Sequence, residues 1–142
     1  LPSFDHPSHS GFLRTSDEGD KEMFFWYFPA LEGGADAPLV IWLQGGPGGS
    51  SMLGLFGEMG PVELDAELRP RLRKHTWNDR YRMLFIDNPV GAGFSFTGTG
   101  SGYCTNSRDC VADNLVSLLE QFYQIFPDAA ASDLYVTGES YG

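Results

Sequence analysis

The sequence predicts an α/β fold, in which helices cover a sheet, and three observations point to it. Two apolar stretches, residues 38–43 and 82–87, each end at a loop that contains glycine and proline. One long amphipathic helix follows them, and a last short apolar stretch follows the helix. Strand, glycine-rich loop, strand, helix and strand in this order are typical of an α/β sheet.

The first two expected strands are separated by a surface turn. Residues 23–28 are rich in aromatic side chains, which we expect to pack within the sheet, and they stop at Pro29. Residues 38–43 are almost all apolar, which indicates a strand buried on both faces. The intervening residues 31–37 contain two adjacent glycines and acidic side chains, as surface turns do.

The second half of the chain supplies the third buried strand, the helix and the last strand. Residues 82–87 have the composition of a buried strand. After Val111, apolar residues recur at the spacing of one face of an amphipathic helix. They are Leu115, Leu118, Leu119, Phe122, Ile125 and Phe126. Pro127 is expected to end this helix, and residues 134–137 then form a strand that leads directly into Gly138.

Composition and motifs exclude several classes of partner. The 142 residues are 42% hydrophobic and 20% charged, which suits one folded domain. A net charge of −10 would repel nucleic acid and anionic membranes, so we expect neither as a partner. No apolar stretch reaches the roughly 18 residues of a membrane span, and the first ten residues do not resemble a signal peptide. Neither a phosphate loop nor a Gly-x-Gly-x-x-Gly motif is present, which argues against nucleotide binding.

The two cysteines allow three states. Cys104 and Cys110 enclose five residues, so they can form a small local disulfide, remain as free thiols, or pair with cysteines outside this chain. Two cysteines are too few for a zinc site of the usual kind, and we expect no metal and no cofactor.

The last five residues form a motif that carries chemistry. Gly138-Glu139-Ser140-Tyr141-Gly142 follows an expected strand, and Gly-x-Ser-x-Gly in that position predicts a nucleophile elbow. The sharp turn would hold the Ser140 hydroxyl above the sheet, where it can attack a carbonyl carbon. The alternative is a tight turn with an exposed serine.

A glycine-rich loop follows an earlier strand. Residues 45–49 read Gly-Gly-Pro-Gly-Gly, and a loop in this place supplies backbone N–H groups that stabilise an oxyanion. The alternative is a merely flexible turn. Because both motifs occupy matching positions, we interpret the pair as the machinery for acyl transfer through a serine.

These motifs together resemble those of the serine carboxypeptidase family, the family of yeast carboxypeptidase Y and cathepsin A. The resemblance rests on residues 10–13, 24–28, 38–51, 58–61 and 86–95 and continues to Gly142. Gln44 and Gly49 stand where the family usually has Asn and Cys, a variation similar to the vitellogenic-like branch. Gly142 stands where the family's elbow usually has Ala before Gly.

The resemblance implies the N-terminal part of an α/β-hydrolase fold, with its first strands, oxyanion loop, one long helix and nucleophile elbow. It also implies a peptidase that releases one residue at a time from a free C-terminus. Ser140 matches the nucleophile, and the backbone N–H groups of Gly46 and Tyr141 match the oxyanion hole. The resemblance further implies an enzyme of a lysosome, vacuole or secreted fluid.

Four further positions match the group that holds the substrate's terminal carboxylate: Gln44, the backbone of Gly45, Glu58 and Glu139. Two ionised carboxyl groups would repel that carboxylate. A buried carboxyl pair that shares a proton has one raised pKa, so we expect the pair to be buried and binding to weaken as pH rises. The alternative is a solvated acidic pair. Asn88, at the end of a strand, is a possible substrate contact.

We expect residues 1–142 to be the N-terminal portion of a single α/β-hydrolase domain, truncated at the elbow. In this fold the triad Asp and His follow the serine, and His6, His9 and His75 all precede Ser140. We expect all three histidines on the surface, and the fragment itself to be inactive without a base. The cluster of basic residues at 69–74 is expected to be a solvated loop.

Two other functions stay open for the complete protein. The same serine serves acyltransferases and esterases, in which an alcohol replaces water or an ester replaces the peptide. A relative that keeps the fold without the triad would instead bind or store. Cleavage of amidated peptides would distinguish a carboxypeptidase from an esterase, because only recognition of the terminal carboxylate requires a free C-terminus.

Overall fold

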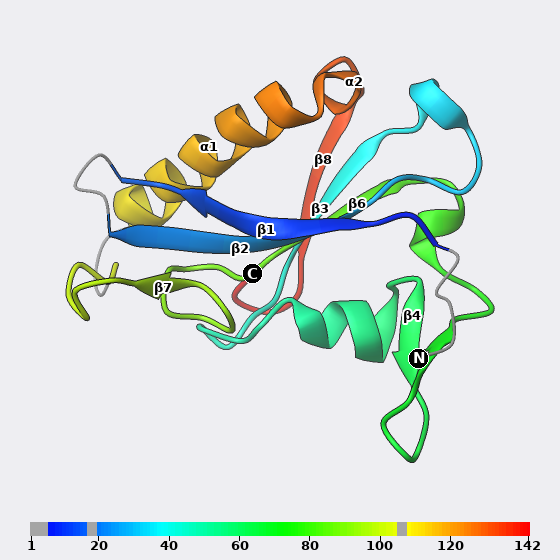
Figure 1. The fold of residues 1–142 in the computed structure, drawn as a ribbon, viewed down its shortest axis with the longest axis horizontal. Coiled ribbons are helices and arrows are strands. Elements are labelled where there is room, and N and C mark those ends of the chain that lie inside the picture. Colours follow the sequence, from blue (N-terminus) through cyan, green and yellow to red (C-terminus); the bar gives the residue numbers. More distant parts are fainter. Residues whose placement is uncertain (1–5, 17–19, 105–107) are drawn as a thin grey trace.

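The computed structural model describes residues 6–16, 20–104 and 108–142, which form a sheet with helices on both faces (Figure 1). The main sheet has the order β1-β2-β6-β3-β8, and the short strand β7 pairs with the beginning of β2. Its strands are β1 (His9–Arg14), β2 (Lys21–Phe28), β3 (Leu39–Leu43), β6 (Arg82–Ile86), β7 (Phe96–Thr97) and β8 (Leu134–Gly138). The second sheet is a hairpin of β4 (Val62–Leu64) and β5 (Pro70–Leu72).

The sheet is mixed, and its parallel part creates the site. β1, β2 and β7 pair antiparallel, whereas β6, β3 and β8 run parallel to one another. Parallel strands end at the same edge of a sheet. The loops that follow β3, β6 and β8 therefore lie along one edge.

Alternation along the strands divides the core between the two faces. Leu39, Ile41 and Leu43 of β3 face the layer that contains α1 (Arg108–Ile125), and Val40 and Trp42 face the opposite layer. The helical segment η2 (Gly54–Glu58) supplies Leu55 to that second layer. Figure 1 shows α1 and this segment on opposite sides of the sheet. Both β3 and β6 are buried along their whole length, as predicted.

The predicted helix is present with shifted ends. It begins at Arg108 and ends at Ile125, and Pro127 opens the short helix α2 (Pro127–Ala130). The expectation that Ile125 belongs to the buried face is wrong, since its side chain is 54% exposed. Phe126 packs against Tyr27 at this end instead, with ring centroids 4.8 Å apart.

The remaining short helices and turns lie outside the sheet. The expected surface turn at residues 31–37 contains the 3-10 helix η1 (Gly34–Asp36), and a second 3-10 helix, η3 (Trp77–Asp79), precedes β6. β8 lies at the edge of the sheet, and the side chains of Leu134, Tyr135 and Val136 are exposed in this chain.

The expected surface position of the histidines is wrong for one of them. His6 is only 7% exposed, and its ring meets Phe28 edge to face at 5.6 Å between centroids. An aromatic neighbour provides the apolar contact that makes this burial favourable. His9 and His75 are exposed, as predicted.

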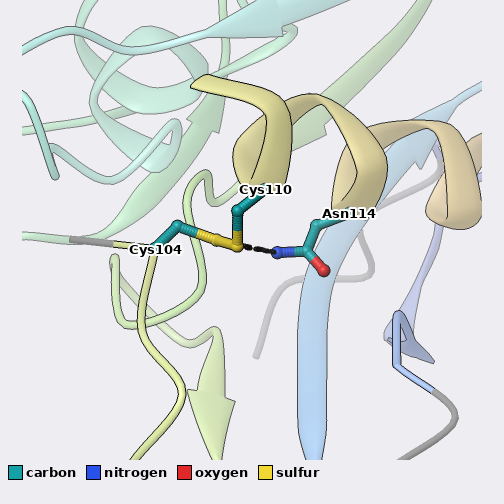
Figure 2. The surroundings of a disulfide bond; sticks show 3 residues. All are labelled: Cys104, Cys110 and Asn114. Atoms are coloured by element: carbon teal, nitrogen blue, oxygen red, sulfur yellow. Dashed lines mark hydrogen bonds between the residues drawn. A yellow bond between two sulfur atoms is a disulfide. The ribbon is translucent and has the colours of Figure 1, made fainter. Parts of the chain in front are cut away.

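Cys104 and Cys110 form a disulfide, the first of the three states considered (Figure 2). The buried amide of Asn114 donates to Cys104 Sγ at 3.1 Å. The bond attaches the segment after β7 to the first turn of α1.

Candidate active site

The elbow at the end of β8 has the backbone geometry of a strained turn. Ser140 has a φ of +55°, in the left-handed region that side chains rarely adopt. A Cβ at Gly138 would lie 2.9 Å from the carbonyl oxygen of Leu43, so only glycine fits there. The turn is closed by Gly142 N–H, which donates to the carbonyl of Glu139 at 2.8 Å.

The glycine-rich loop after β3 contacts the elbow directly. A Cβ on Gly45 would lie 2.8 Å from Ser140 Cβ and 2.9 Å from the backbone nitrogen of Tyr141. Real side-chain carbons do not approach this closely, so glycine is required at this position. The topology thus brings together two motifs that are almost a hundred residues apart in sequence.

The two proposed oxyanion donors lie on either side of this contact. Gly46 has a φ of +129°, and the loop is held closed by Gly49 N–H, which donates to the carbonyl of Gly45 at 2.8 Å. Within the described part of the chain, neither Gly46 N–H nor Tyr141 N–H donates to a protein acceptor. Both donors are therefore available for another oxygen.

Gln44 joins the two glutamates predicted beside it. Its Nε2 donates to Glu139 Oε2 at 2.7 Å and to Glu58 Oε1 at 3.3 Å. Its Oε1 accepts from the indole Nε1 of Trp42 at 2.9 Å, which fixes the direction of the amide. The three side chains named from the sequence therefore form one hydrogen-bonded group next to Ser140.

The expected burial of the glutamate pair is wrong for this chain. Glu58 and Glu139 both lie at the surface. The Gln44 amide bridges them, because its N–H₂ group donates one hydrogen bond to each carboxyl group. The bridge lies at the open edge of the sheet, beyond the ends of the strands, and this position explains the exposure.

Asn88 follows β6 at the same edge of the sheet. Its Oδ1 is buried and has no hydrogen-bond partner among the described residues. Among the described residues, no hydrogen bond joins Asn88 to Gln44, Glu58 or Glu139, so its role as a substrate contact stays a prediction.

The loops are connected by three residues that were not predicted from the sequence as site residues: Asp87, Ser50 and Ser51. Asp87, fully buried after β6, accepts from Ser50 Oγ at 2.7 Å, from Ser51 N–H at 2.8 Å and from Phe94 N–H at 2.8 Å. Ser51 Oγ accepts from Gln44 N–H at 3.2 Å and donates to the carbonyl of Ile86 at 2.5 Å. The one available signal was a carboxyl residue at the exact end of a buried strand.

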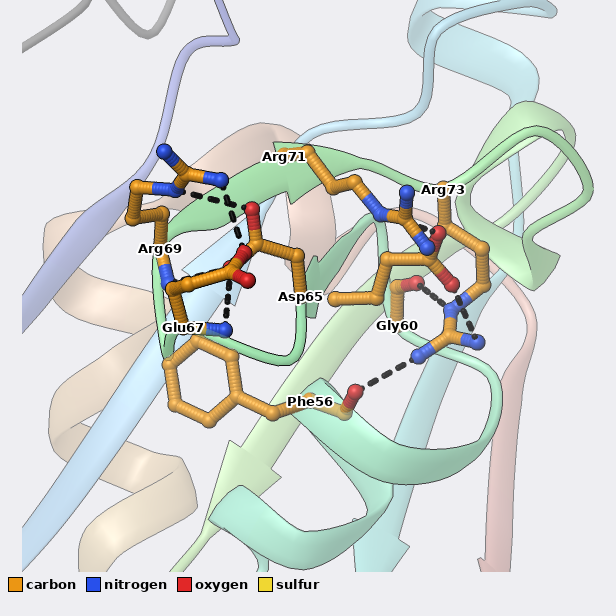
Figure 3. Close-up of polar contacts among 8 residues, drawn as sticks. Phe56, Gly60, Asp65, Glu67, Arg69, Arg71 and Arg73 are labelled. Atoms are coloured by element: carbon orange, nitrogen blue, oxygen red, sulfur yellow. Dashed lines mark hydrogen bonds and ion pairs between the residues drawn. The ribbon is translucent and has the colours of Figure 1, made fainter.

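Arg73 differs from the solvated loop expected of residues 69–74. Its Nε donates to the carbonyl of Gly60 at 2.9 Å, and its Nη2 donates to the carbonyl of Phe56 at 2.7 Å (Figure 3). Its Nη1 pairs with Glu63 at 3.1 Å, and its side chain is only 15% exposed. The two carbonyls flank Glu58 in the sequence, so Arg73 holds the end of the segment that carries it.

Arg69 and Arg71 are solvated, as expected, but residues 70–72 form strand β5, so the expectation of a loop is wrong for them. Arg69 pairs with Asp65 and Glu67, and Arg71 pairs with Glu63, with both arginine side chains more than half exposed (Figure 3). Hydrogen bonds from the Arg69 backbone and side chain lower the pKa of Asp65, the backbone bond having the larger effect.

The described residues contain no cluster of three or more His, Cys, Asp or Glu side chains able to hold a metal ion. No helix among them has both the length and the apolar character to cross a membrane. None of the histidines described is hydrogen-bonded to Ser140.

A protein-family model and known proteins match almost the whole chain in sequence. The family model of serine carboxypeptidases matches residues 2–142. The chain is 51% identical over 141 residues to the Homo sapiens protein named "Probable serine carboxypeptidase CPVL". The alignment covers 99% of this chain and 29% of that protein. The chain is 42% identical over 135 residues to the vitellogenic carboxypeptidase of Aedes aegypti, which covers 95% of this chain and 28% of that protein.

A solved structure gives the same result for the fold. The crystal structure of Kex1(Δ)p, a prohormone-processing carboxypeptidase from Saccharomyces cerevisiae, superposes with a TM-score of 0.79 at 30% identity. The match covers 94% of this chain and 31% of that chain, so the sequence spans less than a third of these relatives. The α/β-hydrolase fold of this neighbour agrees with the predicted fold class, and the vitellogenic-like resemblance is confirmed by the relatives. Because the family model matches nearly the whole chain, the chain belongs to the serine carboxypeptidase family.

Proposed function

We propose that the whole protein is a serine carboxypeptidase that releases C-terminal residues from peptides through an acyl-enzyme on Ser140. The observation that carries this proposal is the contact between Gly45 and the elbow, next to the hydrogen-bonded group of Gln44, Glu58 and Glu139. Residues 1–142 would form the N-terminal portion of a single α/β-hydrolase domain.

In the proposed reaction, Ser140 Oγ attacks the carbonyl carbon of the last peptide bond while a base takes its proton. The Gly46 and Tyr141 N–H groups would stabilise the oxyanion that forms. The C–N bond then breaks, and the amine leaves with a proton. Water hydrolyses the resulting ester and restores the serine. The Asp and His of the triad would come from the part of the relatives that this chain does not span.

Recognition of the terminal carboxylate would use Gln44, the backbone of Gly45, Glu58 and Glu139. Each glutamate already accepts a hydrogen bond from the Gln44 amide. A substrate carboxylate that approaches them would be repelled unless at least one glutamate is protonated, because like charges a few ångströms apart repel strongly. We therefore expect binding to be stronger at acidic pH. This agrees with a lysosomal, vacuolar or secreted enzyme, and the Cys104–Cys110 disulfide also favours an oxidising compartment.

The test compares a peptide with a free C-terminus and the same peptide amidated, using the full-length protein below pH 6. The proposal expects rapid release of the last residue from the free acid and little from the amide. Ser140→Ala should abolish release and also abolish labelling by a fluorophosphonate. Equal cleavage of both peptides would contradict the carboxylate-binding role, and it would favour an esterase or acyltransferase that uses the same elbow. Absence of both labelling and turnover in the wild-type protein would favour a binding or storage relative that lacks the triad.

A further inference from the structure

We propose that Asp87 is a positioning residue that holds the oxyanion loop in its reactive geometry. The proposal rests on the proposed function, since it concerns the loop that carries Gly46. Asp87 is fully buried and does not touch the substrate. It acts through the backbone that it binds.

The Asp87 carboxyl group is a buried hydrogen-bond acceptor at the end of β6. Its side chain has no exposed surface. Oδ1 accepts from Ser50 Oγ at 2.7 Å and from Ser51 N–H at 2.8 Å. Both donors belong to the C-terminal end of the oxyanion loop, the segment 44–51.

The same strand end also holds the beginning of that loop. Gln44 N–H donates to Ser51 Oγ, which in turn donates to the carbonyl of Ile86, the residue before Asp87. Gly49 N–H donates to Gly45 across the loop. Gly46 therefore lies in a closed loop whose two ends are attached to the last residues of β6.

The second carboxyl oxygen binds another loop. Asp87 Oδ2 accepts from Phe94 N–H at 2.8 Å, and a Cβ at Gly93 would lie 2.0 Å from Oδ2, so the loop backbone packs tightly on the carboxyl group. Ser95 Oγ donates to the Asp87 carbonyl at 2.6 Å and accepts from Phe24 N–H. The Asp87 side chain thus links the oxyanion loop to the 91–95 loop, and the Asp87 backbone carbonyl is joined to β2 through Ser95.

Loss of this acceptor would leave the buried N–H of Ser51, and the partly buried Ser50 Oγ and Phe94 N–H, without their partner. Buried N–H groups without acceptors are costly, so the loops would move to find new ones. Oxyanion stabilisation requires donors within about 2.7–3.1 Å of the developing charge, and small displacements weaken it. Because the interaction is stronger in the transition state than in the ground state, the loss should appear in kcat.

The experiment measures kcat and KM of the full-length protein on a peptide with a free C-terminus, together with the rate of Ser140 labelling by a fluorophosphonate. Asp87→Ala should lower kcat and the labelling rate by about 100-fold, with KM changed less than about 3-fold. Asp87→Asn keeps an oxygen for Ser50 and Ser51 but turns an N–H₂ group toward Phe94 N–H, so about 10-fold is expected. Ser50→Ala removes one of the hydrogen bonds and should lower both values by about 3- to 10-fold.

Asp36→Asn is the matched control, since this carboxyl group is exposed in η1, before the opposite end of β3. Thermal unfolding shows which variants fold, and Ser50→Ala decides the outcome if neither Asp87 variant does. A folded variant with unchanged kcat and labelling, or with only a raised KM, would overturn the inference. If wild-type protein is neither labelled nor active, the proposed function fails first. If wild-type protein is labelled and the variants are labelled equally fast, the role of Asp87 alone fails.

Discussion

The indole N–H of Trp42 donates to the side-chain oxygen of Gln44 at 2.9 Å. Because the side-chain oxygen accepts this bond, the amide N–H₂ group of Gln44 points toward Glu58 and Glu139 and donates one hydrogen bond to each. Trp42 is fixed in turn, because it packs edge to face on Trp77 at 5.8 Å between ring centroids, and a Cβ on Gly54 would lie 2.2 Å from its Nε1. The core therefore determines which way an amide at the surface points, and this leads to the first two predictions.

Gln44→Ala should raise KM of the full-length protein for a peptide with a free C-terminus by an amount equivalent to about 1–3 kcal/mol, with a smaller effect on kcat. The variant removes the donor that bridges the two glutamates. Gln44→Asn should be milder, since it keeps the amide but is shorter by one methylene. Steady-state kinetics below pH 6 provide the measurement. If Gln44→Ala equals the wild type in both constants, Gln44 does not contact substrate.

Trp42→Phe should raise KM by less than Gln44→Ala, by about 0.5–1.5 kcal/mol, because it removes the hydrogen bond that orients the amide but keeps the amide itself. Trp77→Phe is the matched control: it alters the packing of Trp42 without removing the bond to Gln44. The same kinetic assay applies to both variants. An equal rise in KM for both would attribute the effect to packing alone.

Gly45→Ala should lower kcat/KM by at least about 100-fold, since the added carbon would displace Ser140 or the Tyr141 N–H. Gly98→Ala is a suitable control, because its new Cβ would meet nothing closer than 3.7 Å. Fluorophosphonate labelling measures the reactivity of Ser140 independently of peptide binding. Full reactivity in Gly45→Ala would mean that the loop and the elbow are not rigidly in contact.

Arg73→Ala should lower the free energy of unfolding by about 1–3 kcal/mol, because the carbonyls of Phe56 and Gly60 lose a shared partly buried donor. It should also raise KM, since the segment that carries Glu58 loses its attachment. Arg71→Ala, at an exposed ion pair of the same hairpin, should cost about 0.5 kcal/mol or less. Denaturant unfolding and peptide kinetics would check both. Equal losses of stability would show that Arg73 is an ordinary surface residue.

Burial raises the pKa of the Tyr27 phenol above its ordinary value. The unfolded chain then ionises first as pH rises past about 10, so the stabilisation is complete below that pH and is lost as pH rises toward the folded pKa. Tyr27→Phe should make the thermal midpoint less sensitive to pH above about 10, with little change near pH 7. Tyr81→Phe, at an exposed tyrosine, is the control. Parallel curves for Tyr27→Phe and wild type above pH 10 would contradict this.

The parts of the fold that the sequence predicts are those with strong local patterns. The apolar runs of β3 and β6, the period of α1 and the glycines of the elbow all reflect requirements of their own segments. β1 is mostly exposed and polar, and β7 has only two residues, so neither has a pattern of its own. Their pairing with β2 is a tertiary property.

The site shows the same division. Ser140 and the loop at 45–49 follow from motifs, whereas the roles of Arg73 and Asp87 depend on carbonyls and N–H groups far away in sequence. Arg73 was misinterpreted because neighbouring basic residues suggested a uniformly solvated loop. Only the fold turns this one side chain toward the segment that carries Glu58.

The register between β3 and β8 has a consequence for how this site can vary among related sequences. Leu43, the last residue before the segment 44–51, lies opposite Gly138, the first residue of the elbow. A strand advances about 3.3 Å per residue and alternates its faces, so a shift of one residue in either strand would displace Ser140, the proposed nucleophile, from Gly46, a proposed oxyanion donor, by that length. The position of Ser140 relative to Gly46 thus depends on the register between β3 and β8. Insertions and deletions are tolerable in the turns before these strands, but a single one within either strand would misalign the site while leaving every catalytic residue in place.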